Sequence, residues 1–254
     1  MTKEYNAPTT EDICQRRNPS QFRDWCKSVL DGVPHEKRSD VRFRIGIWNA
    51  FCGEVLPLSY LANHLEQLGI ELEVTPVIGD QNYDSVIELY LPEGKCEYKL
   101  EITEARQGQE EYLRMRYLQE HGHVWPFGEI TKTGTERTGI KISVSSDCVE
   151  RTETQRKALK LIKNAILKKL NKNYERNSHL LVMVEDIGCF RDEHAEEDYE
   201  LLTAMMIDAI EPNNEIFRVI YILGWSKESF IAFTFDEKTS EILSSDTYRI
   251  IPLR

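Results

Sequence analysis

The sequence predicts an α/β protein: a mixed β-sheet with helices on both faces, preceded by an N-terminal helical segment. Three observations support this class. Apolar residues recur at helical spacing over residues 1–55 and again over residues 150–174. They alternate with period two over residues 70–103, as in strands with one buried face. An unbroken apolar run at 180–184 is bounded by polar residues, which is typical of a strand buried on both faces.

Helices are expected before the first strand. A helical apolar face over residues 22–29 is followed by a break at Gly32-Val33-Pro34, and a second break is expected from Gly53 to Pro57. A further helix at 58–68 should end at Gly69, which stands where a left-handed C-cap residue belongs. This pattern divides the chain into an N-terminal helical segment, 1–55, and an α/β domain, 56–254.

The remaining elements follow from the same two periods. Pro92-Glu93-Gly94-Lys95 has the composition of a turn, so the strands on either side should form an antiparallel hairpin. The expected elements, in chain order, are strands at 70–77, 84–91 and 96–103, a helix at 108–121 ended by Gly122, a β segment at 123–145, a helix at 150–174, a central strand at 180–184, a helix at 195–210, and strands at 217–223, 230–235 and 248–253.

This hairpin carries the candidate site. If its turn pairs Leu91 with Cys96, Asp84 lies opposite Thr103. Asp84 and Glu101 are then diagonal neighbours, roughly 7 to 8 Å apart at the backbone, so their carboxylates can share a cation. One face of the hairpin is apolar, and the other gathers Asp84, Glu88, Glu97, Lys99, Glu101 and Thr103.

Such a polar face suits metal chemistry. Two carboxylates with waters and a phosphate match the oxygen ligands that Mg²⁺ (or Mn²⁺) prefers. Lys99 on the same face would stabilise charge on a phosphate or orient an attacking water. The alternative is that the face simply meets water, with Glu88 opposite Lys99 as a surface pair that contributes ~1 kcal/mol or less.

The order helix, three strands, helix and buried strand resembles the αβββαβ core of the restriction-endonuclease-like PD-(D/E)xK nuclease superfamily. The resemblance covers residues 57–187. In that superfamily an acidic residue on the second strand and an acid-x-Lys pattern on the third hold the catalytic metal. The resemblance therefore implies Asp84 and Glu101 as metal ligands, and Glu66 as the helix acid that some members add.

The sequence departs from this motif in two places. The residue before Asp84 is not Pro, and the position two after Glu101 is Thr103 instead of Lys. Lys99 would fill the cationic role, so the implied catalytic set is Asp84, Glu101 and Lys99. An alternative alignment takes Glu97-Tyr98-Lys99 as the acid-x-Lys pattern, but it places the acid nearer the turn. The missing lysine leaves open an inactive protein that only binds nucleic acid.

A basic segment reverses the overall acidity locally. Residues 156–176 hold eight Lys or Arg residues against one acid, Glu175. Several of these cations share one helical stripe and would contact phosphates; the alternative is a solvated helix face. Lys168, Lys169 and Lys172 are also candidates for a displaced catalytic lysine. The nucleic-acid-binding candidates on the stripe are Lys160, Lys168, Lys172 and Arg176.

Composition limits the classes of function. The chain has 254 residues and a net charge of −11, so a nucleic acid must meet a local basic surface rather than the overall field. Six scattered cysteines without a CxxC pair argue against a disulfide scaffold or a zinc site. No run approaches the ~20 apolar residues of a membrane helix, and the N-terminus lacks a signal-peptide pattern. We therefore expect a cytoplasmic protein without membrane contact.

Together these features predict a metal-dependent, endonuclease-like hydrolase that acts on nucleic acid, with DNA favoured over RNA. Mg²⁺ (or Mn²⁺) is the expected cofactor. The rival hypothesis is a non-enzymatic interaction or regulatory protein with a catalytically inactive nuclease-like fold. Its acidic surface would bind a basic protein partner or a second copy of the chain.

Overall fold

Seven strands form one mixed sheet in the computed structural model, which describes residues 5–92, 94–125, 128–135, 137–147, 149–191, 193–243 and 249–253. The sheet order is β1-β2-β3-β6-β7-β8-β9. The first three strands are antiparallel, whereas β6 runs parallel to both β3 and β7. The strands are β1 (Glu71–Pro76), β2 (Ser85–Leu91), β3 (Gly94–Ala105), β6 (Ser178–Val184), β7 (Phe217–Gly224), β8 (Phe230–Thr234) and β9 (Arg249–Pro252).

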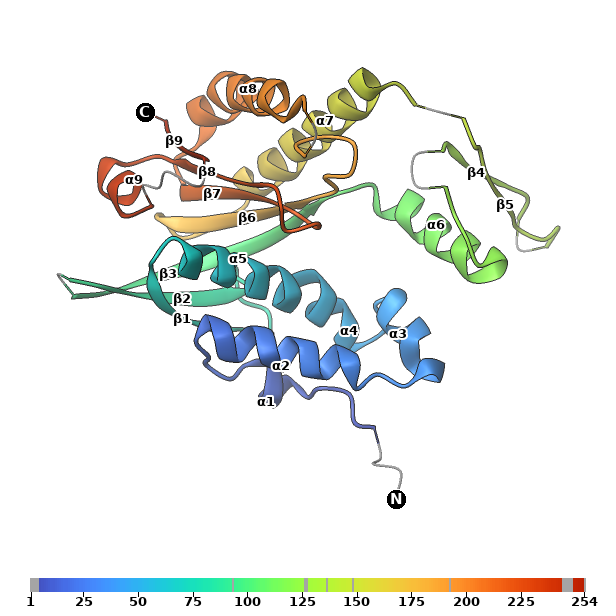
Figure 1. The fold of residues 1–254 in the computed structure, drawn as a ribbon, viewed down its shortest axis with the longest axis horizontal. Helices are drawn as coiled ribbons and strands as arrows, with labels where there is room; N and C mark the ends of the chain where they lie inside the picture. Colours follow the sequence, from blue (N-terminus) through green and yellow to red (C-terminus); the bar gives the residue numbers. More distant parts are fainter. Residues whose placement is uncertain are drawn as a thin grey trace.

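The N-terminal helices cover one face of this sheet. Figure 1 shows α2 and α5 side by side below it. Phe22 of α2 and Leu61 of α5 are fully buried in the same core cluster as Leu100 of β3. These helices are α1 (Thr10–Ile13), α2 (Pro19–Asp31), α3 (Arg38–Arg42), α4 (Ile47–Ala50) and α5 (Leu56–Gln67), with a short 3₁₀ turn at His35–Lys37.

A second pair of helices, α7 (Arg151–Leu170) and α8 (Ala195–Met205), covers the opposite face (Figure 1). Ile162 and Ile166 of α7 pack with Leu180 and Val182 of β6 in a separate core cluster. Every residue of β6 is buried, and the strand lies in the middle of the sheet, as its apolar run predicted. The prediction of a mixed sheet with helices on both faces is thus confirmed.

The remaining elements lie at the margins of the sheet. Figure 1 shows α6 (Gly108–His121) and the β4–β5 hairpin projecting together from the end of β3. Gly122 adopts a φ of 76° and ends α6 as predicted. The strand expected from Tyr248 is seen as β9, although Tyr248 itself is outside the described residues. These elements are β4 (Ile130–Thr133), β5 (Lys141–Val144), the π-helical turn Met206–Ile210, the 3₁₀ turn Glu211–Asn213 and α9 (Glu237–Leu243).

The helix that precedes β1 begins earlier than the sequence indicates. Helical turns run without a break from Ile47 to Gln67, through a π-helical turn at Phe51–Val55. The break expected around Pro57 does not occur: Pro57 directly follows the π-helical turn, inside the continuous helical run. The division expected at residue 55 falls inside this helical run.

The hairpin register differs from the expected one. Leu91 pairs with Gly94 rather than with Cys96, which leaves a connection of only two residues. Gly94 has a φ of 135°, a conformation that favours glycine and permits the tighter turn. Because the shift is two residues, every side chain stays on its predicted face.

Helix α7 is shorter than the sequence indicates. It ends at Leu170 rather than at residue 174, and the Asn171 side chain donates to the carbonyl of Leu167 at 2.9 Å. Asparagine near the end of a helix competes for backbone hydrogen bonds in this way. Lys172 and Arg176 therefore lie in the loop after α7, not on its predicted basic stripe.

Among the described residues, no helix combines the length and the apolar composition that crossing a bilayer requires. The described cysteines are free thiols, and three of the five are buried; Cys148 is outside the described residues. The expectation of scattered, unpaired cysteines holds for this part of the chain.

Candidate active site

Asp84 lies at the point where β2 begins and β3 continues past it. Its backbone N–H donates to the carbonyl of Leu100 at 2.9 Å, and its Oδ2 accepts from the N–H of Ile102 at 2.7 Å. The carboxylate thus lies beside Glu101, not opposite Thr103 as the expected register placed it. The shift in register brings the two predicted metal ligands closer together than a diagonal pair.

Glu101 is nearly buried, with 6% of its surface exposed. Its Oε1 accepts from the hydroxyl of Tyr174 at 3.0 Å and forms an ion pair with the ammonium of Lys169. Burial and the Glu101 charge strongly raise the pKa of Tyr174, which keeps this hydroxyl a neutral donor. Glu101 is therefore held between a cation and a neutral donor.

Lys169 reaches the site from the last turn of α7. It follows the buried residues Ile162 and Ile166 at a spacing of four and then three, so it lies on the helix face that packs on the sheet. Its ammonium also donates to the carbonyl of Ile102 at 3.4 Å. Of the three lysines considered as a displaced catalytic lysine, Lys169 is the one that contacts Glu101.

A third carboxylate, Glu54, lies within electrostatic reach of this pair. It belongs to the π-helical turn Phe51–Val55, which packs against β3. Burial, and then the charges of Asp84 and Glu101, raise the pKa of Glu54 to about 7. Sequence reasoning missed Glu54 because the segment around it was interpreted as a break between helices.

The pKa of Asp84 is also raised, to about 6, first by burial and then by the charge of Glu101. Its hydrogen bond from Ile102 and the charges of Lys169 and Lys172 act in the opposite direction. The lysines thus only partly offset the effects of burial and of the neighbouring carboxylates on the pKa of Asp84. A cluster of this kind favours the arrival of a further cation.

Glu66, the helix acid that the sequence suggested, does not belong to the cluster. It is exposed at the opposite end of α5. Twelve residues separate it from Glu54, which corresponds to roughly 18 Å along a helix at 1.5 Å per residue. Glu54, not Glu66, is the carboxylate of this helical run on which the charges of Asp84 and Glu101 act.

Lys99 shares the face of Glu101 but has other partners. Its ammonium donates to Glu175 at 2.5 Å and lies 4.8 Å from the centre of the Tyr83 ring. The expected cross-strand pair with Glu88 does not form, because Glu88 lies opposite Glu97 and pairs with Arg16 and Lys95 instead. The structure therefore does not bring Lys99 into the Asp84–Glu101 cluster.

The alternative acid-x-Lys alignment is not supported by the geometry. Glu97 is exposed and lies four residues nearer the turn than Glu101. The hydrogen bonds of Asp84 are to residues 100 and 102, on either side of Glu101.

The four nucleic-acid-binding candidates are all exposed. In the described part of the chain, no carboxylate lies within ion-pair distance of Lys160, Lys168, Lys172 or Arg176, whereas Lys157 pairs with Glu110. Of these four residues, Lys172 is the one whose charge acts on Asp84, so it lies nearest the carboxylates. These cations do not form the single stripe that the sequence predicted, because α7 ends at Leu170.

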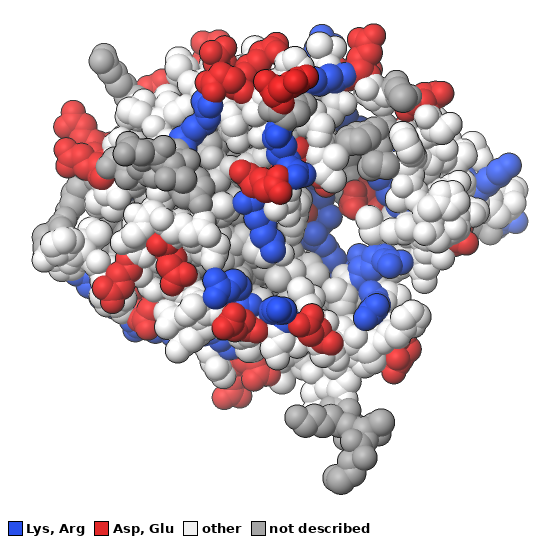
Figure 2. All heavy atoms as spheres, viewed as in Figure 1, with Lys and Arg blue, Asp and Glu red and all other residues white. Residues whose placement is uncertain are grey.

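Other cations lie at the far end of β3. Arg44 and Arg106 both pair with Glu104 there. Figure 2 shows Lys and Arg side chains around the hollow between the parts of the molecule that carry α5 and α6. A local basic surface thus exists despite the net charge of −11.

The donor set of the cluster suits a hard divalent cation. As the side chains lie, no three His, Cys, Asp or Glu residues of the described chain converge closely enough to hold a metal ion. Asp84 and Glu101, with Glu54 nearby, offer only oxygen ligands, which Mg²⁺ and Mn²⁺ prefer. Burial is the main cause of the raised pKa values of Asp84 and Glu54, and a divalent cation would relieve the repulsion between carboxylates that adds to it.

Comparison with known proteins finds no significant match to a protein-family model, a curated protein or a solved structure.

Proposed function

We propose that the protein is a metal-dependent nuclease that hydrolyses phosphodiester bonds in nucleic acid. The observation that carries this proposal is the placement of Asp84 beside Glu101, which pairs with Lys169, at one point of the sheet. These two carboxylates would supply metal ligands, and the lysine would supply the cation that this hydrolysis needs.

The order of elements supports the same proposal. A helix ending at Gln67, three antiparallel strands, α7 and then β6 parallel to β3 occur in this order along the chain, with α6 and the β4–β5 hairpin inserted between β3 and α7. The sheet order β1-β2-β3-β6 places these strands side by side. We propose that they form the αβββαβ core of the PD-(D/E)xK nucleases, with Lys169 supplying the cation that Thr103 cannot.

Each side chain then has a distinct role. Asp84 and Glu101 would hold Mg²⁺ or Mn²⁺, which when bound polarises a phosphate oxygen and lowers the pKa of a coordinated water. Glu54, with a pKa of about 7, is suited to accept a proton from the attacking water near neutral pH. Lys169 would stabilise the negative charge that develops on the phosphate.

The exposed cations supply the contacts that position a nucleic acid. Lys160 and Lys168 on α7, and Lys172 and Arg176 after it, would meet phosphates without selecting a base sequence. Lys172 is placed to link this surface to the site, because its charge reaches Asp84. DNA is the polymer that we propose as the first substrate to test.

The direct test is a cleavage assay on supercoiled plasmid, single-stranded DNA and RNA, in Mg²⁺, Mn²⁺ or EDTA. We expect cleavage of at least one substrate that requires the metal and is lost in Glu101→Gln prepared in parallel. The glutamine keeps an acceptor for Tyr174 but removes the charge. If wild type and Glu101→Gln are equally inert on all three substrates, a binding or regulatory role replaces the nuclease proposal.

A further inference from the structure

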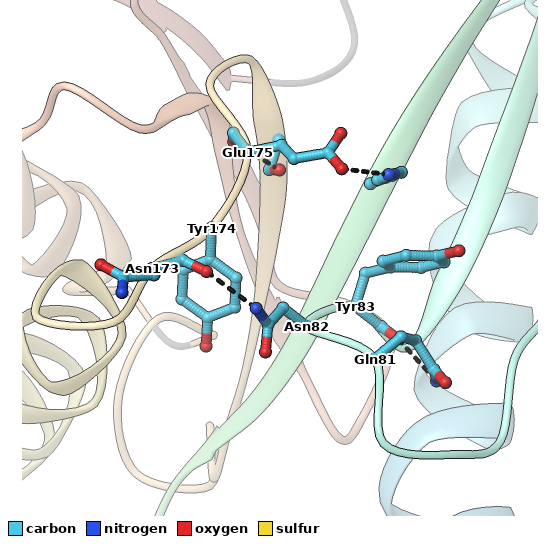
Figure 3. Close-up of a pocket in the computed structure, with 8 residues that line it drawn as sticks. Gln81, Asn82, Tyr83, Asn173, Tyr174 and Glu175 are labelled. Carbon is cyan, nitrogen blue, oxygen red and sulfur yellow. Dashed lines mark hydrogen bonds and ion pairs between the residues drawn. The ribbon is translucent and has the colours of Figure 1, made fainter.

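A pocket of about 320 Å³ opens beside the carboxylate cluster. Two loops form it: residues 81–83, which lead into β2, and residues 173–175, which lead into β6. Figure 3 shows the rings of Tyr83 and Tyr174 on opposite sides of the space, with Asn82 between them. Asn82 links the two loops by donating to the carbonyl of Asn173 at 2.9 Å.

Tyr174 connects this pocket to the proposed catalytic residues. Its ring lines the pocket, while its hydroxyl donates to Glu101 at 3.0 Å. The ring of Phe217 packs against it with 5.4 Å between ring centres, which fixes its position. A group bound in the pocket would therefore lie next to the carboxylate that is proposed to hold the metal.

The charges of the pocket favour a neutral occupant. Lys99, its only described lining cation, is already paired with Glu175 at 2.5 Å. A phosphate placed here would meet the Glu175 carboxylate as well as this occupied ammonium. A neutral, planar group would instead meet the ring of Tyr174, the ring of Tyr83, which the Lys99 ammonium approaches at 4.8 Å, and the amide carbonyl of Asn82.

A nucleobase has these properties, and its size fits the space. The volume is at the lower end of the ~300 to 1,000 Å³ typical of small-molecule sites, too small for a base pair with its backbone. Bases stack readily on aromatic side chains, and a base in a duplex must first leave its stack to do so.

We propose that this pocket receives one base of the substrate, next to the phosphate to be cleaved, so that the protein acts on single strands or unpaired segments. This inference rests on the proposed nuclease function, and it names the substrate class of the same site. It predicts that one nucleotide position, and not its neighbours, depends on having a base.

The test uses a fluorescent 12-nucleotide DNA single strand and a set of the same strand with one abasic position each. Binding is measured by fluorescence anisotropy with Ca²⁺ in place of Mg²⁺, and cleavage is measured with Mg²⁺. We expect one abasic position to weaken binding about tenfold and the others less than about threefold. The matching duplex should bind about tenfold more weakly than the single strand.

Two variants link this effect to the pocket. Tyr83→Leu should weaken binding of the intact strand about tenfold and abolish the difference between abasic positions. Asn82→Ala, at an exposed position, should also weaken binding, but by less. It keeps the test valid if Tyr83→Leu does not fold. Tyr112→Leu, at a tyrosine of α6 that is 53% exposed, is the matched control and should bind as wild type does.

The outcomes separate the two proposals. If cleavage depends on Mg²⁺ and Glu101 but all abasic positions have equal effects, the base-pocket proposal fails and the nuclease proposal stands. Position-specific binding that survives in Tyr83→Leu overturns the base-pocket proposal as well. Position-specific binding that Tyr83→Leu abolishes supports the pocket, even if no cleavage occurs and the nuclease proposal fails. If the protein neither binds nor cleaves any strand, both proposals are overturned.

Discussion

Asp84→Asn should lower metal-dependent cleavage by about 100-fold or more. The substitution keeps the acceptor for the Ile102 N–H but removes a charged metal ligand. A metal ion contributes several kcal/mol to such a reaction, and each 1.36 kcal/mol is a factor of ten in rate. Initial rates on the preferred substrate measure the effect.

Glu66→Gln is the matched control for this prediction. It neutralises an exposed carboxylate at the other end of the helical run, and its rate should stay within about twofold of wild type because Glu66 lies outside the cluster. The cleavage rate of Glu54→Gln should lie between the rates of Asp84→Asn and Glu66→Gln. A full rate in Asp84→Asn, or a large loss in Glu66→Gln, would place the chemistry elsewhere.

Asp84→Asn should also change how stability depends on pH in the metal-free protein. The folded state raises the pKa of Asp84 from 3.8 to about 6, so it binds an extra proton between these values. The free energy of unfolding therefore falls as the pH rises through this window, and asparagine removes that loss. We expect the variant to gain on the order of 2 kcal/mol over wild type between pH 4 and pH 7.5. Urea unfolding in EDTA measures it, and parallel curves for the two proteins would contradict the raised pKa.

Lys169→Met should lower cleavage by roughly 10²- to 10³-fold, because it removes the cation that is proposed to stabilise phosphate charge. It should also destabilise the fold by about 3 kcal/mol, since Glu101 loses its ion-pair partner in a nearly buried site. Single-turnover cleavage and urea unfolding separate the two effects.

Two further proteins make this prediction specific. Lys169→Met with Glu101→Gln should recover much of the stability but none of the cleavage, because the buried charge is gone while the site stays incomplete. Lys27→Met removes an exposed lysine of α2, on the opposite face of the sheet, and should leave both quantities unchanged. Normal cleavage in Lys169→Met would exclude a catalytic role for this lysine.

The positions of Asp84 and Glu101 could be predicted because strand periodicity fixes the face of each side chain. The register could not, since it depended on Gly94 adopting a positive φ and tightening the turn. A shift of two residues preserves faces, so the candidate pair survived an incorrect register. A shift of one would have placed Asp84 and Glu101 on opposite faces of the sheet.

The partners from other elements depended on tertiary structure. The sequence left Lys168, Lys169 and Lys172 open. The choice between Lys168 and Lys169 follows from the rotation of α7, and the apolar positions Ile162 and Ile166 are a signal that could have indicated Lys169. Glu54 had no comparable signal, because Gly53 and Pro57 on either side of it are typical of a break. A π-helical turn accommodates them within a continuous helix.

Titration of Mn²⁺ at pH 7.5, followed by calorimetry, tests most directly whether the carboxylate cluster is a metal site. We expect saturable binding to wild type that weakens at least about tenfold in Asp84→Asn, persists in Glu66→Gln, and weakens at pH 5.5, where Asp84 and Glu54 are protonated. Binding that is equally strong in Asp84→Asn, or absent from wild type, would contradict the proposed site.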